Sequence, residues 1–283
     1  MLAVLSLWGC GVGPAHPSTI ESLQIVAIET DPTEVSPGSS VLARLSIADP
    51  AGEGAEVVVA SCLYFENRCA EEVLADADQW LTLAELAPGE TSVAVQRRVP
   101  QAARQVFDVV ELSSVPLALV GLACAPGLCP IVEDARSALE AGSVPTSLAV
   151  DIAQPDRWMI DLPVAGVSLA GKSLLLNEIV EDLPNISPRH EARFLERDDP
   201  VIVVPAGGEQ EFSFYVDDPE GDTVYAYAYT TLGRFEERRV RVRDNTARHY
   251  LLAPQQRGEG QVFIVFEDES GGTSVWERAI RIE

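Results

Sequence analysis

From Ile20 onward, apolar and polar residues mostly alternate with a period of two, which is the pattern of strands buried on one face. In the segment 41–47, for example, one strand face carries Val41, Ala43, Leu45 and Ile47, and the other carries Leu42, Arg44 and Ser46. A turn at Pro37 precedes this segment. The same pattern predicts further strands at 22–29, 56–63, 91–99, 105–112, 115–122, 146–153, 157–164 and 172–179. Many short strands of this kind predict an all-β fold made of antiparallel sandwiches.

Two stretches depart from the strand pattern. Between Pro130 and Gly142 the apolar residues recur at helical spacing, with proline at the start and glycine near the end, which predicts a short amphipathic helix. The stretch 70–87 fits neither period well and contains a candidate helical turn at 71–77. We therefore expect the first half of the chain to carry insertions between its strands.

The segment Glu181–Pro188, EDLPNISP, is rich in proline and polar residues and has strand-like sequence on both sides. We place a linker at 181–188, between a first domain at 20–180 and a second at 189–283. Alternation in the second domain predicts seven strands, at 201–204, 210–217, 223–230, 238–243, 248–252, 260–267 and 274–282. Seven strands in about 100 residues are typical of a two-sheet sandwich.

Two turns in the second domain carry a resemblance to a known class of repeat. Val216–Val224, VDDPEGDTV, is similar to the D-P-[DE]-G-D-x-[LV] turn of bacterial cadherin-like and related Ig-like repeats. Glu267–Thr273, EDESGGT, is similar to their late D-x-x-G-G turn. The first domain shares only the pattern of Pro32–Gly38, PTEVSPG, with Ig-like modules of lipoproteins. The resemblance implies two Ig-like antiparallel β-sandwiches, the first enlarged by disulfide-bearing loops and a short helix.

The first nine residues, MLAVLSLWG, form a short apolar stretch that is typical of a processing signal. Its end, at Leu7–Cys10, resembles the lipobox of bacterial lipoproteins, in which the cysteine becomes the lipidated first residue. The resemblance implies lipidation of Cys10, a flexible tether at 10–19 and, because Gly11 is not aspartate, an outer-membrane location. The open alternative is a buried N-terminal strand with a free cysteine, which Pro14 and Pro17 oppose.

Four further cysteines remain, in two close pairs. In an exported chain they are expected to form the local disulfides Cys62–Cys69 and Cys124–Cys129, although other pairings are formally open. A four-cysteine zinc site is the alternative. The C-x2-C spacing of such sites is absent here, because six and four residues separate the paired cysteines.

The formal net charge of -24 disfavours a nucleic-acid partner, and we expect none, because phosphate binding needs a basic surface. It also disfavours direct docking on anionic lipid, so we expect contact with the membrane through the lipid anchor only. Lys172 is the one lysine among 20 basic residues. The expected partner is a protein or glycan of the cell envelope.

The acidic turn of the second domain is a candidate calcium site, and Ca²⁺ is the only cofactor that we consider. Carboxylate oxygens are the ligands that calcium prefers. The candidate ligands are Asp217, Asp218, Glu220, Asp222 and Asp268. In the alternative interpretation these acids only cap the turn and face solvent.

The segment 223–230 places three tyrosines on one strand face and smaller apolar residues on the other. If Val224 faces the core, as the resemblance implies, the tyrosines face outward beside the arginines of 238–243, and we expect them to be exposed. Such a surface suits a protein or glycan ligand. The alternatives are a ladder that only stabilises the sheet, or tyrosines in the core. The candidate surface comprises Tyr225, Tyr227, Tyr229, Arg239, Arg241 and Arg243.

Catalytic motifs are absent from the sequence, which contains no G-x-S-x-G elbow, no H-E-x-x-H and no paired metal-ligand spacing. We therefore expect a non-catalytic binding, adhesion or structural module. Two alternatives stay open: an accessory lipoprotein of an envelope assembly, and an extracytoplasmic hydrolase. A hydrolase would need His249 in a concave pocket within reach of a serine or a carboxylate.

Overall fold

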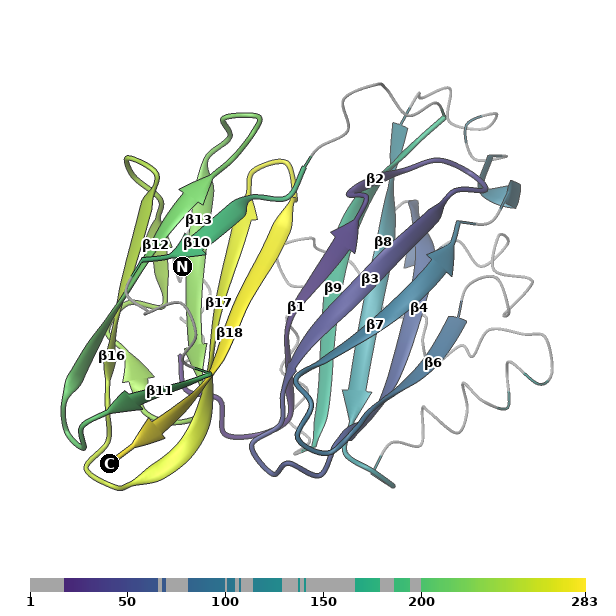
Figure 1. The fold of residues 1–283 in the computed structure, drawn as a ribbon. Coiled ribbons are helices and arrows are strands. Elements are labelled where there is room, and N and C mark those ends of the chain that lie inside the picture. The colour runs from purple at the N-terminus through teal and green to yellow at the C-terminus, as the bar shows by residue number, and fades with distance from the viewer. Residues whose placement is uncertain are drawn as a thin grey trace, which may run out of the picture.

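A computed structural model of the chain (Figure 1) shows an all-β protein made of two Ig-like sandwiches. It describes residues 18–65, 68–69, 81–99, 101–104, 107, 114–128, 137, 140, 166–178, 186–193 and 200–283. In these ranges no helix has both the length and the apolar character needed to cross a membrane.

The first sandwich has a three-stranded sheet, in the order β1-β3-β7, and a six-stranded sheet, in the order β2-β9-β8-β4-β5 with β6 paired to β4. Its strands are β1 (Gln24–Asp31), β2 (Glu34–Val35), β3 (Ser40–Ala48), β4 (Ala55–Phe65), β5 (Arg68–Cys69), β6 (Leu81–Leu86), β7 (Ser92–Arg98), β8 (Ser114–Cys124) and β9 (Val167–Asn177). A 3-10 helix at Gln101–Arg104 follows β7. Strand β8 lies at the centre of the larger sheet and is buried along most of its length.

The core of the first sandwich lies between these two sheets. Leu45 and Ile47 of β3 face Val57, Val59 and Leu119 of the larger sheet, and all five are completely buried. Glycine is needed at position 121 of β8, because a Cβ atom there would lie 2.6 Å from the Leu45 side chain. The sheets can therefore approach closely at this point.

The second sandwich has a four-stranded sheet, in the order β10-β12-β16-β14, and a five-stranded sheet, in the order β11-β18-β17-β13-β15. Its strands are β10 (Arg189–Ala192), β11 (Val201–Val204), β12 (Glu209–Asp217), β13 (Val224–Thr230), β14 (Arg234–Phe235), β15 (Arg239–Arg241), β16 (Thr246–Leu252), β17 (Gly258–Asp268) and β18 (Thr273–Ile282). Aromatic side chains fill its core: Phe212 and Phe214 each pack edge-on against Trp276, with ring centroids 5.9 Å and 5.1 Å apart.

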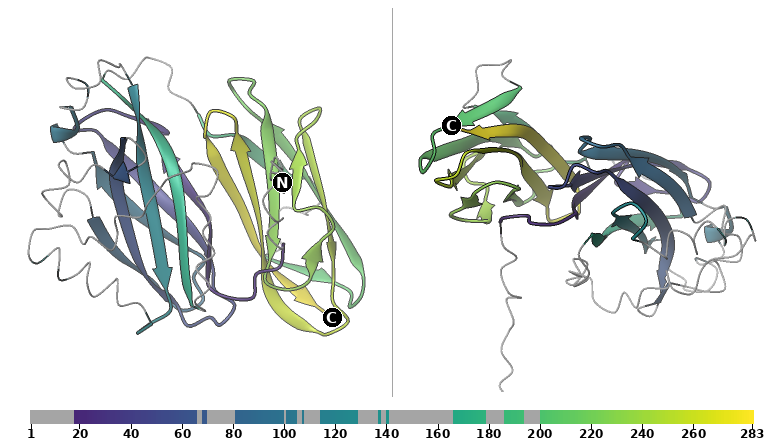
Figure 2. Two further views of the ribbon diagram at one scale, coloured as in Figure 1. Left: turned by 180° about the vertical axis from the view of Figure 1, so that it is seen from behind. Right: turned by 90° about the horizontal axis from the view of Figure 1, so that it is seen from below.

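The two sandwiches lie side by side, with β1 of the first against β17 and β18 of the second (Figures 1 and 2). We call this contact the seam. A small apolar cluster fills part of it, comprising Ile20, Val26, Ala27, Ala48, Tyr229, Phe263 and Val265. Ser18–Ile20 pairs with the end of β13, because Ile20 N–H donates to Thr230 O at 2.7 Å and Thr230 N–H donates to Ser18 O at 2.8 Å. The start of the described chain is thus bound to the second sandwich.

The predicted alternation is confirmed in the described residues, where β1, β3, β4, β7, β8 and β9 occupy predicted segments and all seven strands predicted for the second domain are present. The short strands β10 and β14 of that domain were not predicted. The strands predicted at 146–153 and 157–164 lie outside the described residues. So do the segments 105–112 and 130–142, apart from residues 107, 137 and 140. The predicted antiparallel sandwiches are confirmed. Two short edge strands are the exceptions, because β11 runs parallel to β18 and β2 runs parallel to β9. Strand β6 forms in the ambiguous stretch 70–87.

Candidate functional site

Three of the five predicted calcium ligands converge at one end of the second sandwich. Asp218 and Glu220 lie in the turn between β12 and β13, and Asp268 ends β17. Each offers a carboxylate oxygen, and these oxygens all lie within 4.8 Å of one another. The turn can bring them together because Gly221, at a φ of 79°, reverses the chain between the two strands. We call Asp218, Glu220 and Asp268 the carboxylate cluster.

Asp268 is the buried member of this cluster, with only 8% of its surface exposed. Its Oδ1 accepts the Gly272 N–H at 2.7 Å, whereas its Oδ2 is buried and has no hydrogen-bond partner within the described part of the chain. Burial raises the pKa of Asp268 above its ordinary value and repulsion from Asp218 adds to that rise, whereas the N–H groups of Gly272 and Ser270 and the charge of Lys172 oppose it. A cation would compensate this buried charge.

Glu220 is exposed at the rim of the cluster. Desolvation raises its pKa, the hydrogen bond from Ile186 N–H lowers it, and repulsion from Asp218, Asp268 and Asp222 raises it further. The cluster is therefore a set of acids that disfavour one another's ionisation. Three such oxygens supply part of the six to eight ligands that calcium takes, water being the usual complement.

The two remaining predicted ligands lie outside the cluster. Asp222 accepts a hydrogen bond from Ser270 Oγ through its Oδ2, which ties the two turns together. Asp217 lies opposite Arg189 in the pairing of β12 with β10. Turn capping is also present, because Asp218 accepts the N–H groups of Glu220 at 3.3 Å and Asp222 at 2.5 Å. Capping and cation binding are therefore compatible here.

The same end of the sandwich holds the segment that arrives from the first domain. Glu220 Oε1 accepts the Ile186 N–H at 2.8 Å, and Ser187 Oγ accepts the Thr273 N–H at 3.2 Å. The cluster is thus connected to the interdomain segment through one of its own carboxylates.

Sequence reasoning missed the polar part of the seam, where Lys172 of β9 is buried. Its Nζ donates hydrogen bonds to Gly271 O and Thr273 Oγ1 of the second sandwich. Burial lowers the pKa of Lys172 below its ordinary value, although the carboxylates of Glu267, Asp268 and Glu29 oppose that shift. The sequence held one sign of this role, because Lys172 is the one lysine of an acidic chain.

Glu29 of β1 makes a second polar contact across the seam. Its Oε1 accepts the Val275 N–H at 3.0 Å. Val275 lies in the part of β18 that has no pairing with β11, because β11 pairs only with residues 279–282. Burial raises the pKa of Glu29, while this hydrogen bond and the nearby Arg44 lower it. The contact caps an otherwise open sheet edge, which natural proteins commonly protect.

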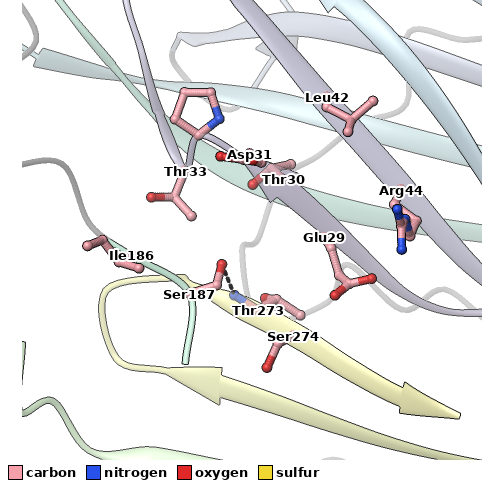
Figure 3. A pocket seen from close by; sticks show the side chains of 11 residues that line it. Glu29, Thr30, Asp31, Thr33, Leu42, Arg44, Ile186, Ser187, Thr273 and Ser274 are labelled. Atoms are coloured by element: carbon pink, nitrogen blue, oxygen red, sulfur yellow. Dashed lines mark hydrogen bonds between the residues drawn. The ribbon is translucent and has the colours of Figure 1, made fainter. Parts of the chain in front are cut away.

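A groove of about 420 Å³ opens between the sandwiches beside these contacts (Figure 3). Strands β1 and β3 line one side, and the interdomain segment and the start of β18 line the other. Its lining is Glu29, Thr30, Asp31, Pro32, Thr33, Leu42, Arg44, Ile186, Ser187, Thr273 and Ser274. Two polar side chains of this lining, those of Glu29 and Ser187, accept hydrogen bonds from backbone N–H groups of β18. They therefore hold the two sandwiches together.

The tyrosine and arginine ladder is present, with Tyr225 opposite Arg241 and Tyr227 opposite Arg239. Arg239 stacks 3.8 Å from the centre of the Tyr225 ring. Val224, Ala226 and Ala228 face the core of the sandwich, as predicted.

The expectation that all three rings are exposed is wrong for Tyr229. Only 3% of its surface is exposed, because the first sandwich covers this end of the strand face. Its hydroxyl accepts a hydrogen bond from Arg238 Nη2 at 2.7 Å. Tyr227 is half-buried against the same apolar cluster, and Tyr225 is also only partly buried. Arg239, Arg241 and Arg243 are exposed.

His249 does not meet the requirement for a hydrolase site. It is 1% exposed in β16, and its Nδ1 lies 3.1 Å from the backbone oxygen of Glu237. Burial lowers the pKa of His249 to about 4, so the ring is neutral at pH 7. His190 Nδ1 lies 3.1 Å from Ser274 Oγ, but its ring stacks on the core residue Phe266. Among the described residues no carboxylate contacts that imidazole, so the pair lacks the third member of a triad.

The cysteine predictions fall mainly on residues outside the description. Cys10 and Cys129 are among them, and no side chain is described at Cys62 or Cys69. Cys124 is buried and disulfide-bonded, with its partner outside the described side chains, so both proposed pairings stay predictions. The register opposes a Cys62–Cys124 bond: Cys62 pairs with Ala118, six positions from Cys124 along β8, or roughly 20 Å.

No protein-family model and no curated protein matches this chain. Solved structures match at low similarity. Red sea bream transglutaminase is 10% identical at a TM-score of 0.29, over 93% of this chain and 32% of that one. Clostridium thermocellum CbhA fibronectin(III)-like modules are 9% identical at a TM-score of 0.27, over 90% and 93% of the two chains. The D0-D1 domain of intimin is 10% identical at a TM-score of 0.25, over 90% and 98%.

Proposed function

We propose that this chain is a non-catalytic lipoprotein of the bacterial cell envelope, anchored through Cys10, whose two sandwiches act as one binding, adhesion or structural module. The observation that carries the proposal is the seam. The buried Lys172 and the half-buried Glu29 of the first sandwich bind backbone groups of the second, and an apolar cluster lies beside them. Domains of one chain usually move relative to each other unless their interface is extensive, so this seam supports a single rigid unit.

The partner of such a unit is a protein or glycan of the envelope, and the open face of β13 and β15 is its candidate contact surface. An accessory role in a larger envelope assembly is the second candidate, because a rigid, anchored spacer serves it equally well. The geometry of His249 opposes the hydrolase alternative.

The anchor is tested by metabolic labelling with a palmitate analogue in a host that processes lipoproteins. We expect label on the wild-type chain and none on Cys10→Ser. The control variant is Cys62→Ser, which removes a different thiol and should keep the label. Label retained by Cys10→Ser would contradict the anchor, and so would an unprocessed N-terminus.

The proposed module includes a bound Ca²⁺ at the carboxylate cluster. Asp268 Oδ2, which is buried and has no hydrogen-bond partner among the described residues, supports it, because a divalent cation would satisfy that oxygen and offset the mutual repulsion of the three acids. With Glu220 also bound to Ile186 N–H, the cation would stabilise the arriving segment as well as the turn.

Thermal unfolding with and without Ca²⁺, after treatment with a chelator, tests this site. At a concentration about 100 times the dissociation constant, binding to the folded state adds about 2.7 kcal/mol of stability. We expect Ca²⁺ to raise the Tm of the wild type and of the control Asp217→Asn, and to leave Asp268→Asn unchanged. An equal rise in Asp268→Asn would place any bound cation elsewhere.

A further inference from the structure

The groove between the two sandwiches is elongated, and the fold fixes both of its walls. Its volume of about 420 Å³ lies in the range of protein ligand sites, which occur preferentially at domain interfaces. Figure 3 shows Ile186 near one end of the groove and Arg44 near the other. Ile186 is held by the hydrogen bond from its N–H to Glu220 Oε1, and Arg44 lies in the paired strand β3. A ligand would therefore meet a site that is already formed.

The hydroxyl groups on the wall beside β18 are already bonded within the protein. Ser187 Oγ accepts the Thr273 N–H, and Thr273 Oγ1 accepts a hydrogen bond from Lys172 Nζ. Ser274 Oγ lies 3.1 Å from His190 Nδ1. Recognition of a ligand therefore depends mainly on the opposite wall, which β1 and β3 form.

Asp31 is the carboxylate of that opposite wall that has no partner. Its side chain is exposed and makes no hydrogen bond or ion pair with the described part of the chain. Glu29, by contrast, binds the Val275 N–H and lies opposite Arg44 in the pairing of β1 with β3. In the same register Asp31 lies opposite the apolar Leu42. The pairing thus gives the cation of the lining to Glu29 and leaves Asp31 available.

The charges at the groove are predominantly negative. Arg44 is the one cation among the lining residues, and Lys172 lies behind the wall at Thr273. His190 is neutral at pH 7, because burial lowers its pKa to about 4. The acids that line the groove or interact with Ile186 and Lys172 are more numerous: Glu29, Asp31, Glu220, Glu267 and Asp268. A recess lined mainly by one sign of charge attracts a group of the opposite sign.

Exposed apolar side chains accompany the carboxylate of Asp31. Leu42 is 40% exposed and Ile186 is 42% exposed, and both line the groove together with Pro32. They are two of the five large apolar side chains that are exposed in the described residues. A lysine or arginine side chain combines an apolar stem with a charged end. Its stem can pack on Leu42 while its charged end reaches Asp31.

We propose that this groove binds an extended segment of a partner protein, with a lysine or arginine side chain at Asp31 and an apolar side chain of the same segment at Ile186. The inference deepens the proposed binding role and rests on it. The elongated shape suits an extended segment, and a charge-assisted hydrogen bond to Asp31 supplies specificity. A glycan is less suitable, because the lining contains no aromatic ring on which a sugar could stack.

Fluorescence polarisation of labelled peptides tests this site in the full chain. The probes are the amidated pentapeptides Val-Thr-Lys-Thr-Val and Val-Thr-Glu-Thr-Val, labelled at the amino terminus, in about 0.1 M salt with a chelator. In an extended peptide, the central side chain and both valines share one face. We expect the lysine peptide to bind roughly tenfold more tightly than the glutamate peptide, because Asp31 attracts one and repels the other.

Two variants and a matched control locate the binding. Asp31→Asn should weaken binding of the lysine peptide about fivefold and reduce its advantage over the glutamate peptide. Leu42→Ser should weaken both peptides, because it removes the apolar contact. Glu53→Gln removes the charge of an exposed acid of the first sandwich outside the lining, and should bind like the wild type. Circular dichroism should show all three variants folded.

Equal binding of the two peptides, or equal losses in Asp31→Asn and Glu53→Gln, would overturn the proposal. Absence of binding by either peptide would also overturn it, and binding of N-acetylglucosamine oligomers instead would assign the groove to a glycan. If neither peptide binds but crosslinking in intact cells still captures a partner protein, the binding role stands and the groove alone is wrong.

Discussion

The outer face of β13 has two halves that share one sequence pattern and differ in their surroundings. At one end, Tyr229 is buried under the first sandwich. At the other end, Tyr225 is half-exposed and lies under Arg239. Period-two alternation places both rings on the same face, but it does not say what covers that face. The comparison shows that one strand can contribute both to an internal seam and to an external surface.

Replacing the two tyrosines gives the sharpest contrast between these halves. Tyr229→Ala should cost about 3 to 5 kcal/mol of unfolding free energy, because it leaves a cavity in the seam and removes the partner of Arg238. Tyr225→Ala should cost about 1 kcal/mol or less, since it loses mainly a cation–π contact. Urea unfolding of both variants measures the difference. Equal costs would show that the seam is not formed in solution.

The seam and the open surface of the second sandwich also differ in their cations, because Lys172 lies in the seam and Arg241 lies outside it. Lys172→Met should cost about 3 kcal/mol, because Glu267, Asp268 and Glu29 would lose the one buried positive charge near them. Arg241→Met should change stability by about 0.5 kcal/mol or less. The same urea titrations apply. A neutral or stabilising Lys172→Met would mean that apolar packing alone holds the seam.

The smallest effect concerns the pH dependence of the seam through Glu29. Its pKa is raised by burial, so the folded state holds a proton more tightly than the unfolded state does. The stability that Glu29 contributes is therefore fully present below its ordinary pKa of 4.5, and is lost as the pH rises through the raised value. Glu29→Gln keeps an acceptor for Val275 N–H and removes this titration.

Between pH 7 and pH 5, the wild type should therefore gain stability relative to Glu29→Gln, by less than the effects above. Glu21→Gln, an exposed acid outside the seam, should follow the wild type. Parallel pH profiles for the wild type and Glu29→Gln would show that the seam does not bury this carboxylate.

Local sequence was sufficient to predict most strands and part of the candidate site. The alternation around Phe212 and Phe214 predicts β12, and the DPEG turn predicts that Asp218 and Glu220 lie near each other. Asp268 was a candidate because its own turn resembles a known repeat. Local sequence did not distinguish these three from Asp217 and Asp222, because the distances between carboxylates depend on how two separate turns meet.

Lys172, Glu29 and Tyr229 show what requires tertiary structure. The sequence by itself determined the all-β architecture, the shared face of the tyrosines and the acidic character of the turn, because each follows from residues a few positions apart. Only the folded chain decided that Tyr229 is covered, that Lys172 meets Gly271 and that Ser18 binds Thr230 of β13. These contacts join residues 99 to more than 200 positions apart, and no local pattern specifies such pairs.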